Sequence, residues 1–330
     1  IRVKETDING ISSEHDFGKV IEIIEHKDIL KLPDDNPYLL NFNNKTYSYT
    51  KDELIKNNEF NSGVYAFKFN YLVKLIYEIK NDNAQKEIYI TDLISIFNKN
   101  GLTVSAVSPK QQHVIMGFNN KSVLKEMESI ARGIAYNKLK DIIEIDDPDD
   151  FFIHDDVIKQ IMDLDSQGTP LDIKIGKGVY IGKGVKLNYN LNLSKNVFVE
   201  GNVIFGENVK IWENVHLSTF PHQEFFIGDN VEVLWNNIIK GKIKIGNNCR
   251  IESSVNMTGS DENPLIIGNN VIIKGTSYIF GSVIDDDIFI EHSVIIKKKI
   301  DRILKKDGSV MPVMFYLPMP RGIDAVSSLK

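Results

Sequence analysis

The sequence predicts an α/β region followed by an all-β domain built as a parallel β-helix. Apolar residues recur every six positions at Ile175, Ile181, Leu187, Leu193, Val199, Phe205, Ile211 and Leu217. A second column, offset by four positions, consists of Val179, Val185, Leu191, Val197, Val203, Val209 and Val215. No helix has a period of six and an antiparallel strand has a period of two, whereas this period is typical of a β-helix with short inward-facing strands. The first 130 or so residues lack this repeat.

The six-residue repeat continues after two interruptions. Its later inward residues are Ile227, Val233, Ile239, Ile245, Ile251, Met257, Ile267, Ile273, Ile279, Ile284, Ile290 and Ile296, with Val231, Ile243, Cys249 and Val255 as companions. Segments 218–226 and 259–264 break the pattern with polar residues, Pro and Gly, and we expect loops there. Three hexapeptides form one coil, which predicts about seven coils within residues 171–300. The short sides resemble the left-handed hexapeptide β-helix, and the left-handed sense follows from that resemblance against the usual crossover rule.

Three other regions complete the chain. Residues 1–142 alternate short apolar segments with amphipathic ones, as part of an α/β layered fold does. We expect strands at 20–25, 63–69 and 102–107, and helices at 71–80, 91–98 and 121–140, with Thr91 as the N-cap of the second helix. Residues 143–170 are predicted as an acidic linker with a short helix at 155–165. Residues 301–330 form a Pro-rich apolar tail, which we expect to pack in extended form on the β-helix or on a neighbouring subunit.

Composition narrows the class of protein. The 330 residues carry a net charge of −6 with both signs interspersed, which argues against a nucleic-acid partner because such binding needs a basic stripe. No apolar stretch is long enough for a membrane-spanning helix and no signal-peptide pattern is present, so no membrane partner is expected. The single cysteine, Cys249, excludes an internal disulfide and fits a cytoplasmic protein.

Five short motifs follow one another in the first region. They are Phe17-Gly18-Lys19-Val20, Ile24-Glu25-His26-Lys27-Asp28, Phe60-Asn61-Ser62-Gly63-Val64, Asn83-Ala84-Gln85-Lys86-Glu87-Ile88-Tyr89-Ile90-Thr91-Asp92 and Gly117-Phe118-Asn119-Asn120. With the Asp-Pro segment and the hexapeptide repeat behind them, they resemble the bacterial UDP-N-acetylglucosamine pyrophosphorylase (N-acetylglucosamine-1-phosphate uridylyltransferase) family. The resemblance covers most of residues 1–150 by motif and 171–297 by fold. It implies that residues 1–142 are part of a Rossmann-like nucleotidyltransferase domain.

Three of the motif residues have chemistry that suits a sugar. Gly18 lets a backbone approach a ligand closely, although a glycine in a hairpin needs no ligand. Glu25 could accept hydrogen bonds from a sugar hydroxyl or amide, as the matching family glutamate does, or it is simply a surface residue. Asn61 offers a donor and an acceptor for an acetamido group or hydroxyl, or it caps a strand.

The other candidates rest more heavily on the resemblance. Thr91 would lie near the sugar phosphate, at a helix N-terminus that suits an anion. Glu87 and Tyr89 are substrate-binding residues by resemblance alone. Asn119 would supply an oxygen ligand to Mg²⁺, although an asparagine at a helix start also serves as a cap. No catalytic residue is assigned.

The resemblance implies a reaction and two substrates. A full-length enzyme would join UTP and an amino-sugar 1-phosphate, N-acetylglucosamine 1-phosphate, to form UDP-N-acetylglucosamine and pyrophosphate. The family's Gly-rich nucleotide loop and its metal-binding aspartate are not found in these residues. Because phosphoryl transfer depends on positioning and neutralising the phosphates, we expect residues 1–330 alone to be inactive.

The β-helix leaves alternatives open. Its expected role is assembly of a homotrimer. A second possibility is an acyltransferase that uses acetyl-CoA, with His216, His222 or His292 as a base, but the family's G-H-x-x-Y and N-I-G-A-G-T segments are absent. The third is a non-catalytic trimeric scaffold.

Overall fold

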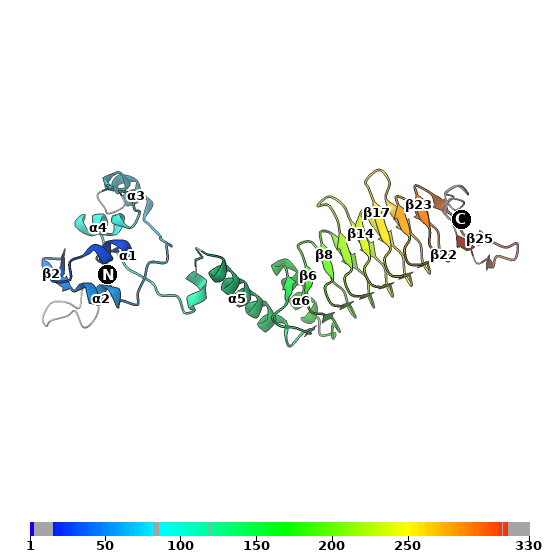
Figure 1. Ribbon diagram of the computed structural model, residues 1–330, viewed down its shortest axis with the longest axis horizontal. Helices are drawn as coiled ribbons and strands as arrows, with labels where there is room; N and C mark the ends of the chain where they lie inside the picture. Colours follow the sequence, from blue (N-terminus) through cyan, green and yellow to red (C-terminus); the bar gives the residue numbers. More distant parts are fainter. Residues whose placement is uncertain (3–15, 82–85, 116, 119, 312, 316–330) are drawn as a thin grey trace, which may run out of the picture. The chain divides into compact units, whose positions relative to one another are not determined.

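The computed structural model describes residues 1–2, 16–81, 86–115, 117–118, 120–311 and 313–315 (Figure 1). The chain divides into two compact units, Ile1–Val123 and Leu124–Lys330. The elements of the first unit are α1 (His26–Lys31), β1 (Tyr38–Phe42), β2 (Lys45–Tyr49), α2 (Lys51–Ile55), α3 (Phe69–Leu75), the 3₁₀ turn η2 (Ile76–Glu78), α4 (Asp92–Lys99) and the 3₁₀ turn η3 (Gln112–Ile115). Helix α5 (Lys121–Leu139) begins in the first unit and continues in the second, close to its predicted bounds.

Two small apolar clusters hold the first unit together. In one, the antiparallel hairpin β1–β2 packs Leu40, Phe42 and Tyr47 against Ile21. Its turn residues, both asparagines, have positive φ, as a two-residue hairpin turn of this kind requires. In the other, α3 and α4 bury Leu75, Leu93 and Phe97. These clusters are modest, so the unit exposes many large apolar side chains.

The strands predicted at 20–25, 63–69 and 102–107 are wrong as regular elements. The first and third of these segments form only isolated bridges, Val20 with Arg2 and Ser105 with Lys19, and the described residues 63–69 form none. A strand is stabilised by hydrogen bonds to its neighbours, and the described residues supply single bridges instead of paired strands. The helix predicted at 71–80 is also shorter, since α3 ends at Leu75 and tightens into η2.

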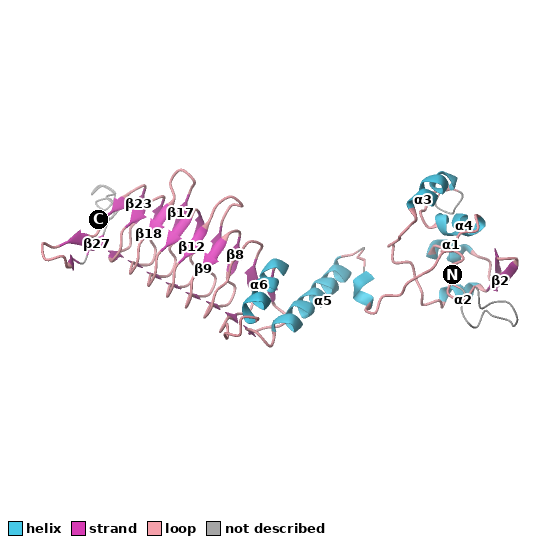
Figure 2. Cartoon of the chain, turned by 180° about the vertical axis from the view of Figure 1, so that it is seen from behind, coloured by secondary structure: helices cyan, strands magenta, loops and turns pink. Residues whose placement is uncertain are grey.

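The second unit is a parallel β-helix, which confirms the predicted fold (Figure 2). Helix α6 (Asp155–Asp165) precedes most of its coils and has its predicted bounds. In the described residues the first sheet contains β3 (Glu144–Ile145), β5 (Lys174–Ile175), β7 (Asn192–Leu193), β10 (Lys210–Ile211), β13 (Glu232–Val233), β16 (Arg250–Ile251), β19 (Ile272–Ile273), β22 (Ile288–Ile290) and β27 (Val313–Phe315). The second contains β4 (Phe151–Ile153), β6 (Val179–Ile181), β8 (Phe198–Glu200), β11 (His216–Ser218), β14 (Ile238–Gly241), β17 (Asn256–Gly259), β20 (Tyr278–Phe280) and β23 (Val294–Ile296). The third contains β9 (Val203–Phe205), β12 (Phe225–Ile227), β15 (Ile243–Ile245), β18 (Leu265–Ile267), β21 (Val283–Ile284) and β24 (Lys299–Ile300).

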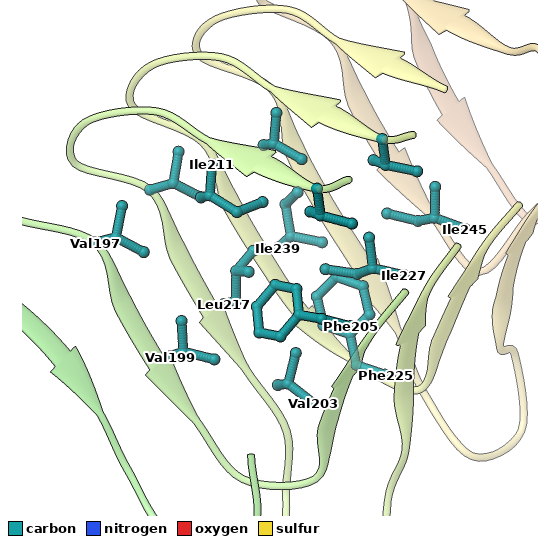
Figure 3. Close-up of a cluster of buried hydrophobic side chains, with 14 of the residues drawn as sticks. Val197, Val199, Val203, Phe205, Ile211, Leu217, Phe225, Ile227, Ile239 and Ile245 are labelled. Atoms are coloured by element: carbon teal, nitrogen blue, oxygen red, sulfur yellow. The ribbon is translucent and has the colours of Figure 1, made fainter. Parts of the chain in front are cut away.

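The interior of the β-helix contains the apolar columns that the repeat predicts. Figure 3 shows Val199, Phe205, Ile211 and Leu217 turned toward one another from different sheets. All of them are buried, as are their companions in the second column. Full burial of such a side chain contributes roughly 1.5–3 kcal/mol, so each coil adds stability by the same means.

The corners of the coils depend on asparagine. Eight asparagines of the second unit have positive φ: Asn190, Asn196, Asn208, Asn214, Asn230, Asn236, Asn248 and Asn270. Asparagine tolerates this left-handed conformation better than most residues. At two corners the side chains also bond to one another from coil to coil, for example Asn190 Nδ2 to Asn208 Oδ1 at 2.9 Å and Asn196 Nδ2 to Asn214 Oδ1 at 3.1 Å. Asparagine therefore marks these corners in most coils, and Ser254, Thr276 and Asp287 adopt the same backbone conformation at three of the others.

The structure corrects the repeat at one position and extends it at both ends. Ile296, predicted to face inward, is 48% exposed, and Ile295 is buried in its place because β23 pairs Ile279 with Ile295. The segment predicted as linker and helix also contributes β3 and β4, which pair with the following coil.

The structure contains the two predicted loops and part of the predicted extended tail. Segments 219–224 and 260–264 leave the β-helix between the second and third sheets. In the tail, β25 (Ile303–Leu304) and β26 (Val310–Met311) form an antiparallel hairpin, and β27 pairs in parallel with β22. Extended packing on the β-helix is thus confirmed for 313–315. Within the described part of the chain, no helix has the length and apolar character that crossing a bilayer requires.

Candidate functional site

Several residues predicted to bind a sugar lie close together in the first unit. Glu25 is the N-cap residue of α1 and has extended backbone angles. The pKa values of Tyr65 and Tyr89 are both raised, chiefly because their phenols are partly removed from water. The carboxylate of Glu25 adds to each of these shifts. The side chain of Asn61 hydrogen-bonds Tyr65, and that of Glu87 hydrogen-bonds Tyr89. Tyr65 and Tyr89, from two separate segments, are therefore both within electrostatic range of Glu25.

The sequence did not single out Tyr65. It lies two residues beyond Gly63, at the end of the Asn61 motif, and its half-buried ring alternates with exposed neighbours. That alternation in an extended segment is the signal that could have identified it, because it places Tyr65 and Phe67 on the same side.

Thr91 occupies the position predicted for it but does not cap the helix. It precedes α4 with helical backbone angles, and its side chain makes no capping bond. The residue is 5% exposed, and its Oγ1 has no hydrogen-bond partner among the described residues. The first amides of α4 already bond to carbonyls of the preceding turn, Asp92 N to Tyr89 O at 3.2 Å and Leu93 N to Ile90 O at 3.2 Å. The start of α4 therefore offers neither a row of free amides nor an exposed hydroxyl, because the Thr91 Oγ1 atom is enclosed by the protein.

Acidic side chains surround the helix start. Burial raises the pKa of Asp92, and the nearby carboxylate of Asp28 raises it further. These groups favour hydrogen-bond donors such as sugar hydroxyls, since a carboxylate accepts hydrogen bonds only.

Gly18 lies in a tight turn. Its φ is +78°, and Lys19 N donates to Asp16 O at 3.1 Å across the turn. A Cβ at this position would meet no atom within 4 Å, so the positive φ alone explains the glycine. The turn is held by buried Asp16, which accepts from Asn43 Nδ2 at 2.7 Å.

The predicted magnesium ligand Asn119 lies outside the described residues. Among those that are described, no group of three or more His, Cys, Asp and Glu side chains is arranged to hold a metal ion. The described residues do not by themselves form a Mg²⁺ site, and magnesium binding stays a prediction.

The histidines of the β-helix have three different surroundings. His222 Nε2 lies 2.7 Å from Asp261 Oδ2, which links the two loops that leave the coils. His216 stacks on Phe198 at 4.5 Å, and its Nε2 is 3.2 Å from Ser218 Oγ. His292 Nδ1 lies 2.7 Å from Gly275 O, a contact that belongs to the coil itself.

Comparison with known proteins gives related sequences but no matching family model. A bifunctional protein GlmU of Clostridium tetani is 33% identical over 142 residues, which are 43% of this chain and 26% of that protein. The bifunctional protein GlmU of Acetivibrio thermocellus is 32% identical over 141 residues, with 42% and 26% covered. That of Clostridium botulinum (strain ATCC 19397 / Type A) is 34% identical over 115 residues, with 35% and 20% covered.

This chain therefore spans about a quarter of the length of the curated relatives it matches. The resemblance predicted from the motifs is confirmed as sequence similarity to bifunctional proteins of this kind.

Proposed function

We propose that the first unit binds the sugar 1-phosphate of a nucleotidyltransferase reaction, in which N-acetylglucosamine 1-phosphate and UTP give UDP-N-acetylglucosamine and pyrophosphate. The observation that carries the proposal is that Tyr89 and Tyr65, the latter hydrogen-bonded by Asn61, are both within electrostatic range of Glu25. The similarity to bifunctional GlmU proteins supports it. A cytoplasmic location is part of the same proposal.

In this proposal the residues bind and orient the sugar phosphate. Glu25 accepts hydrogen bonds from the sugar, Asn61 donates to it, and the tyrosine rings cover one side of it. Thr91 lies near the sugar phosphate at the start of α4. Holding the phosphate in place is the contribution that these residues make to transfer, because such reactions are accelerated mainly by positioning and charge stabilisation. Asn119 is proposed to bind Mg²⁺, which would neutralise phosphate charge when bound.

Calorimetry with N-acetylglucosamine 1-phosphate tests the proposal on the whole chain. We expect saturable binding that Asn61→Ala weakens at least about tenfold, as loss of a substrate hydrogen bond does. Asn57→Ala is the matched control, since Asn57 Oδ1 accepts from Glu59 N at 3.2 Å in a similar local turn. Binding that is absent in the unsubstituted chain would refute the proposal. Mixing with UTP should release no pyrophosphate.

We further propose that the β-helix assembles homotrimers. The second sheet carries an aromatic ladder on its outer face, made by the stacked rings of Phe152, Tyr180, Phe198 and His216 at spacings of 4.7, 4.7 and 4.5 Å. Phe152 remains 45% exposed. Light scattering on Phe198→Glu tests this face. We expect the unsubstituted chain to have the mass of a trimer and the variant a lower mass, and a monomer mass for both would contradict the proposed trimer.

A second candidate function is acyl transfer by the β-helix. Its support is the pairing of His222 with Asp261, because a carboxylate can orient an imidazole as a general base. Calorimetry with acetyl-CoA separates this candidate from a scaffold. Acetyl-CoA binding that is lost in His222→Ala would favour an acyltransferase. If the unsubstituted chain does not bind acetyl-CoA, a non-catalytic scaffold is the remaining alternative.

A further inference from the structure

The hairpin of β25 and β26 projects beyond the last coils of the β-helix and exposes apolar side chains on both of its faces (Figure 1). Its register pairs Ile303 with Met311 and Leu304 with Val310. Partners across a two-stranded ribbon lie on the same face, and successive residues lie on opposite faces. All four side chains are exposed, Leu304 to 57% and Val310 to 38%. A contiguous exposed apolar surface marks a contact with another molecule or with a membrane.

The apolar surface continues from the hairpin onto β27. Val310 lines an open groove of about 640 Å³ together with Val313 and Met314 of β27 and Phe289 of β22. Six of the eight lining residues are apolar, and Met314 is 68% exposed. The hairpin and this edge of the first sheet therefore form one apolar surface at the end of the β-helix.

Basic side chains surround the same hairpin. Residues 297–307 contain six lysines and arginines and two aspartates, although the whole chain has a net charge of −6. Two of the six basic groups pair with aspartates, whereas Lys298, Lys305 and Lys306 form no ion pair within the described part of the chain. Lys305 and Lys306 are exposed in the connection between the two strands. Positive charge and apolar surface thus occur together here.

The connection that carries the two lysines is held by its own hydrogen bonds. Lys305 N donates to Ser309 O at 2.8 Å, and Gly308 N donates to Lys305 O at 2.9 Å. The carboxylate of Asp307 accepts from Ser309 N at 2.9 Å and from Ser309 Oγ at 2.6 Å. This acidic group is therefore engaged by Ser309, and the positive charges of the lysines are available to a partner.

A bilayer surface that contains anionic lipids matches both features. Its head groups pair with lysine ammonium groups, and the boundary between head groups and acyl chains accepts apolar side chains. The carbon stem of a lysine can rest on apolar surface while its charged end stays among the head groups. The net negative charge of the whole chain opposes this contact only weakly, because exposed charges more than about 8 Å away are screened at physiological ionic strength.

We propose that the β25–β26 hairpin binds the surface of a bilayer containing anionic lipids, with its apolar side chains at the interface and Lys305 and Lys306 at the lipid phosphates. Such a contact needs no membrane-spanning helix and no signal peptide, whose absence was the reason to expect no membrane partner. It involves the second unit alone and does not depend on the proposed sugar site.

Co-sedimentation of the whole chain with vesicles tests the proposal. We expect binding to vesicles of phosphatidylcholine mixed with phosphatidylserine that weakens as salt is added, and little binding to phosphatidylcholine alone. Lys305→Gln combined with Lys306→Gln should lower the partition coefficient about 25-fold, since each lysine near an anionic surface contributes about a fivefold gain. Lys183→Gln combined with Lys195→Gln is the matched control, because it removes the same charge from exposed positions in the early coils and should change binding little.

A fluorescent label locates the contact. The single cysteine, Cys249, is 2% exposed, so the cysteine of a Leu304→Cys variant can be labelled selectively with a polarity-sensitive dye. We expect the emission of this label to shift to shorter wavelength when the anionic vesicles are added. A label on Ile266→Cys, at an exposed position of β18, should not shift.

Failure of the unsubstituted chain to bind anionic vesicles would overturn the inference and leave the proposed sugar site standing. Binding that the combined substitution of Lys305 and Lys306 does not weaken would also overturn it. Retention on heparin without binding to vesicles would indicate an acidic macromolecule as the partner, and the lipid proposal would be wrong.

Discussion

Asn237 Oδ1 accepts a hydrogen bond from Val255 N at 2.6 Å, joining two successive coils inside the β-helix. Asn237 is fully buried at a column position that Val197, Val215 and Val255 occupy in other coils. Its Nδ2 also donates to Leu234 O at 2.7 Å. A polar residue is tolerated here because both of its groups have partners.

Asn237→Val should therefore destabilise the β-helix although valine fits the repeat. The substitution leaves Val255 N–H and Leu234 C=O without these partners, and an unsatisfied buried group costs roughly 1–3 kcal/mol. We expect a net loss of about 2 kcal/mol in urea unfolding, since the new apolar side chain offsets part of the cost. Asn236→Gly, at the neighbouring exposed corner, should cost less than about 1 kcal/mol. Equal stability of both variants would contradict this account.

Gly241 should tolerate no side chain. Its φ is +97°, and a Cβ would overlap the backbone oxygen of Gly259 in the next coil. Gly168 also has a positive φ, +81°, but an added Cβ there meets nothing within 4 Å. We expect Gly168→Ala to cost roughly 1–2 kcal/mol for the backbone conformation. Gly241→Ala should cost about 1–3 kcal/mol more for the overlap. Thermal unfolding of the two variants measures the difference, and a smaller loss at Gly241 would refute it.

His216 should make stability depend on pH. Burial lowers the pKa of its imidazole, Glu200 opposes this shift, and Lys240 adds to it. The folded state disfavours protonation of His216. The contribution of the neutral imidazole to folding stability is therefore fully present above its ordinary pKa of about 6.5 and is lost as the pH falls through the lower pKa of the folded state.

His216→Phe keeps the ring stacking on Phe198 and removes the titration. Between about pH 7.5 and pH 5, the melting temperature of the unsubstituted protein should therefore fall further than that of the variant. Parallel pH profiles, or a His216 pKa at or above the ordinary value in an NMR titration, would count against this prediction.

The contact between His222 and Asp261 should be visible in the titration of the carboxyl. The hydrogen bond from His222 lowers the pKa of Asp261, and a bond from Gln223 adds to this. The ionised carboxylate of Asp261 thus contributes to folding stability above the ordinary pKa of an aspartate. This contribution is lost as the pH falls through the lower pKa that Asp261 has in the folded state. In carbon NMR, His222→Ala should raise the pKa of Asp261 toward its ordinary range. The pKa of Asp307, lowered by Ser309, should not change. A fixed Asp261 value would exclude the pairing in solution.

Much of the β-helix was predictable because its pattern is local. A side chain such as Val199 or Ile211 faces inward according to its place in a six-residue unit, and each unit packs on a copy of itself. The prediction failed at Ile296, where a shift of one residue turns the preceding side chain, Ile295, inward. The hairpin of β25 and β26 was also missed, although Asp307-Gly308 is a turn signal in its loop.

In the first unit, the sequence supplied candidates and not their arrangement. Motifs placed Glu25, Asn61 and Tyr89 in order along the chain, but their approach to one another depends on packing between segments far apart in sequence. Tyr65 could be related to Asn61 only once its phenol was placed beside the amide.

The sequence by itself determined the coiled architecture, since a repeated local register needs no distant partner to be specified. Only the tertiary structure decided which polar groups meet, as between His222 and Asp261, 39 positions apart. The physical reason is that the two features depend on parts of the chain at different separations. Which side chains of the β-helix are buried follows from a local periodicity, whereas a hydrogen bond between two loops requires a donor atom and an acceptor atom from distant segments to lie within about 3 Å of each other.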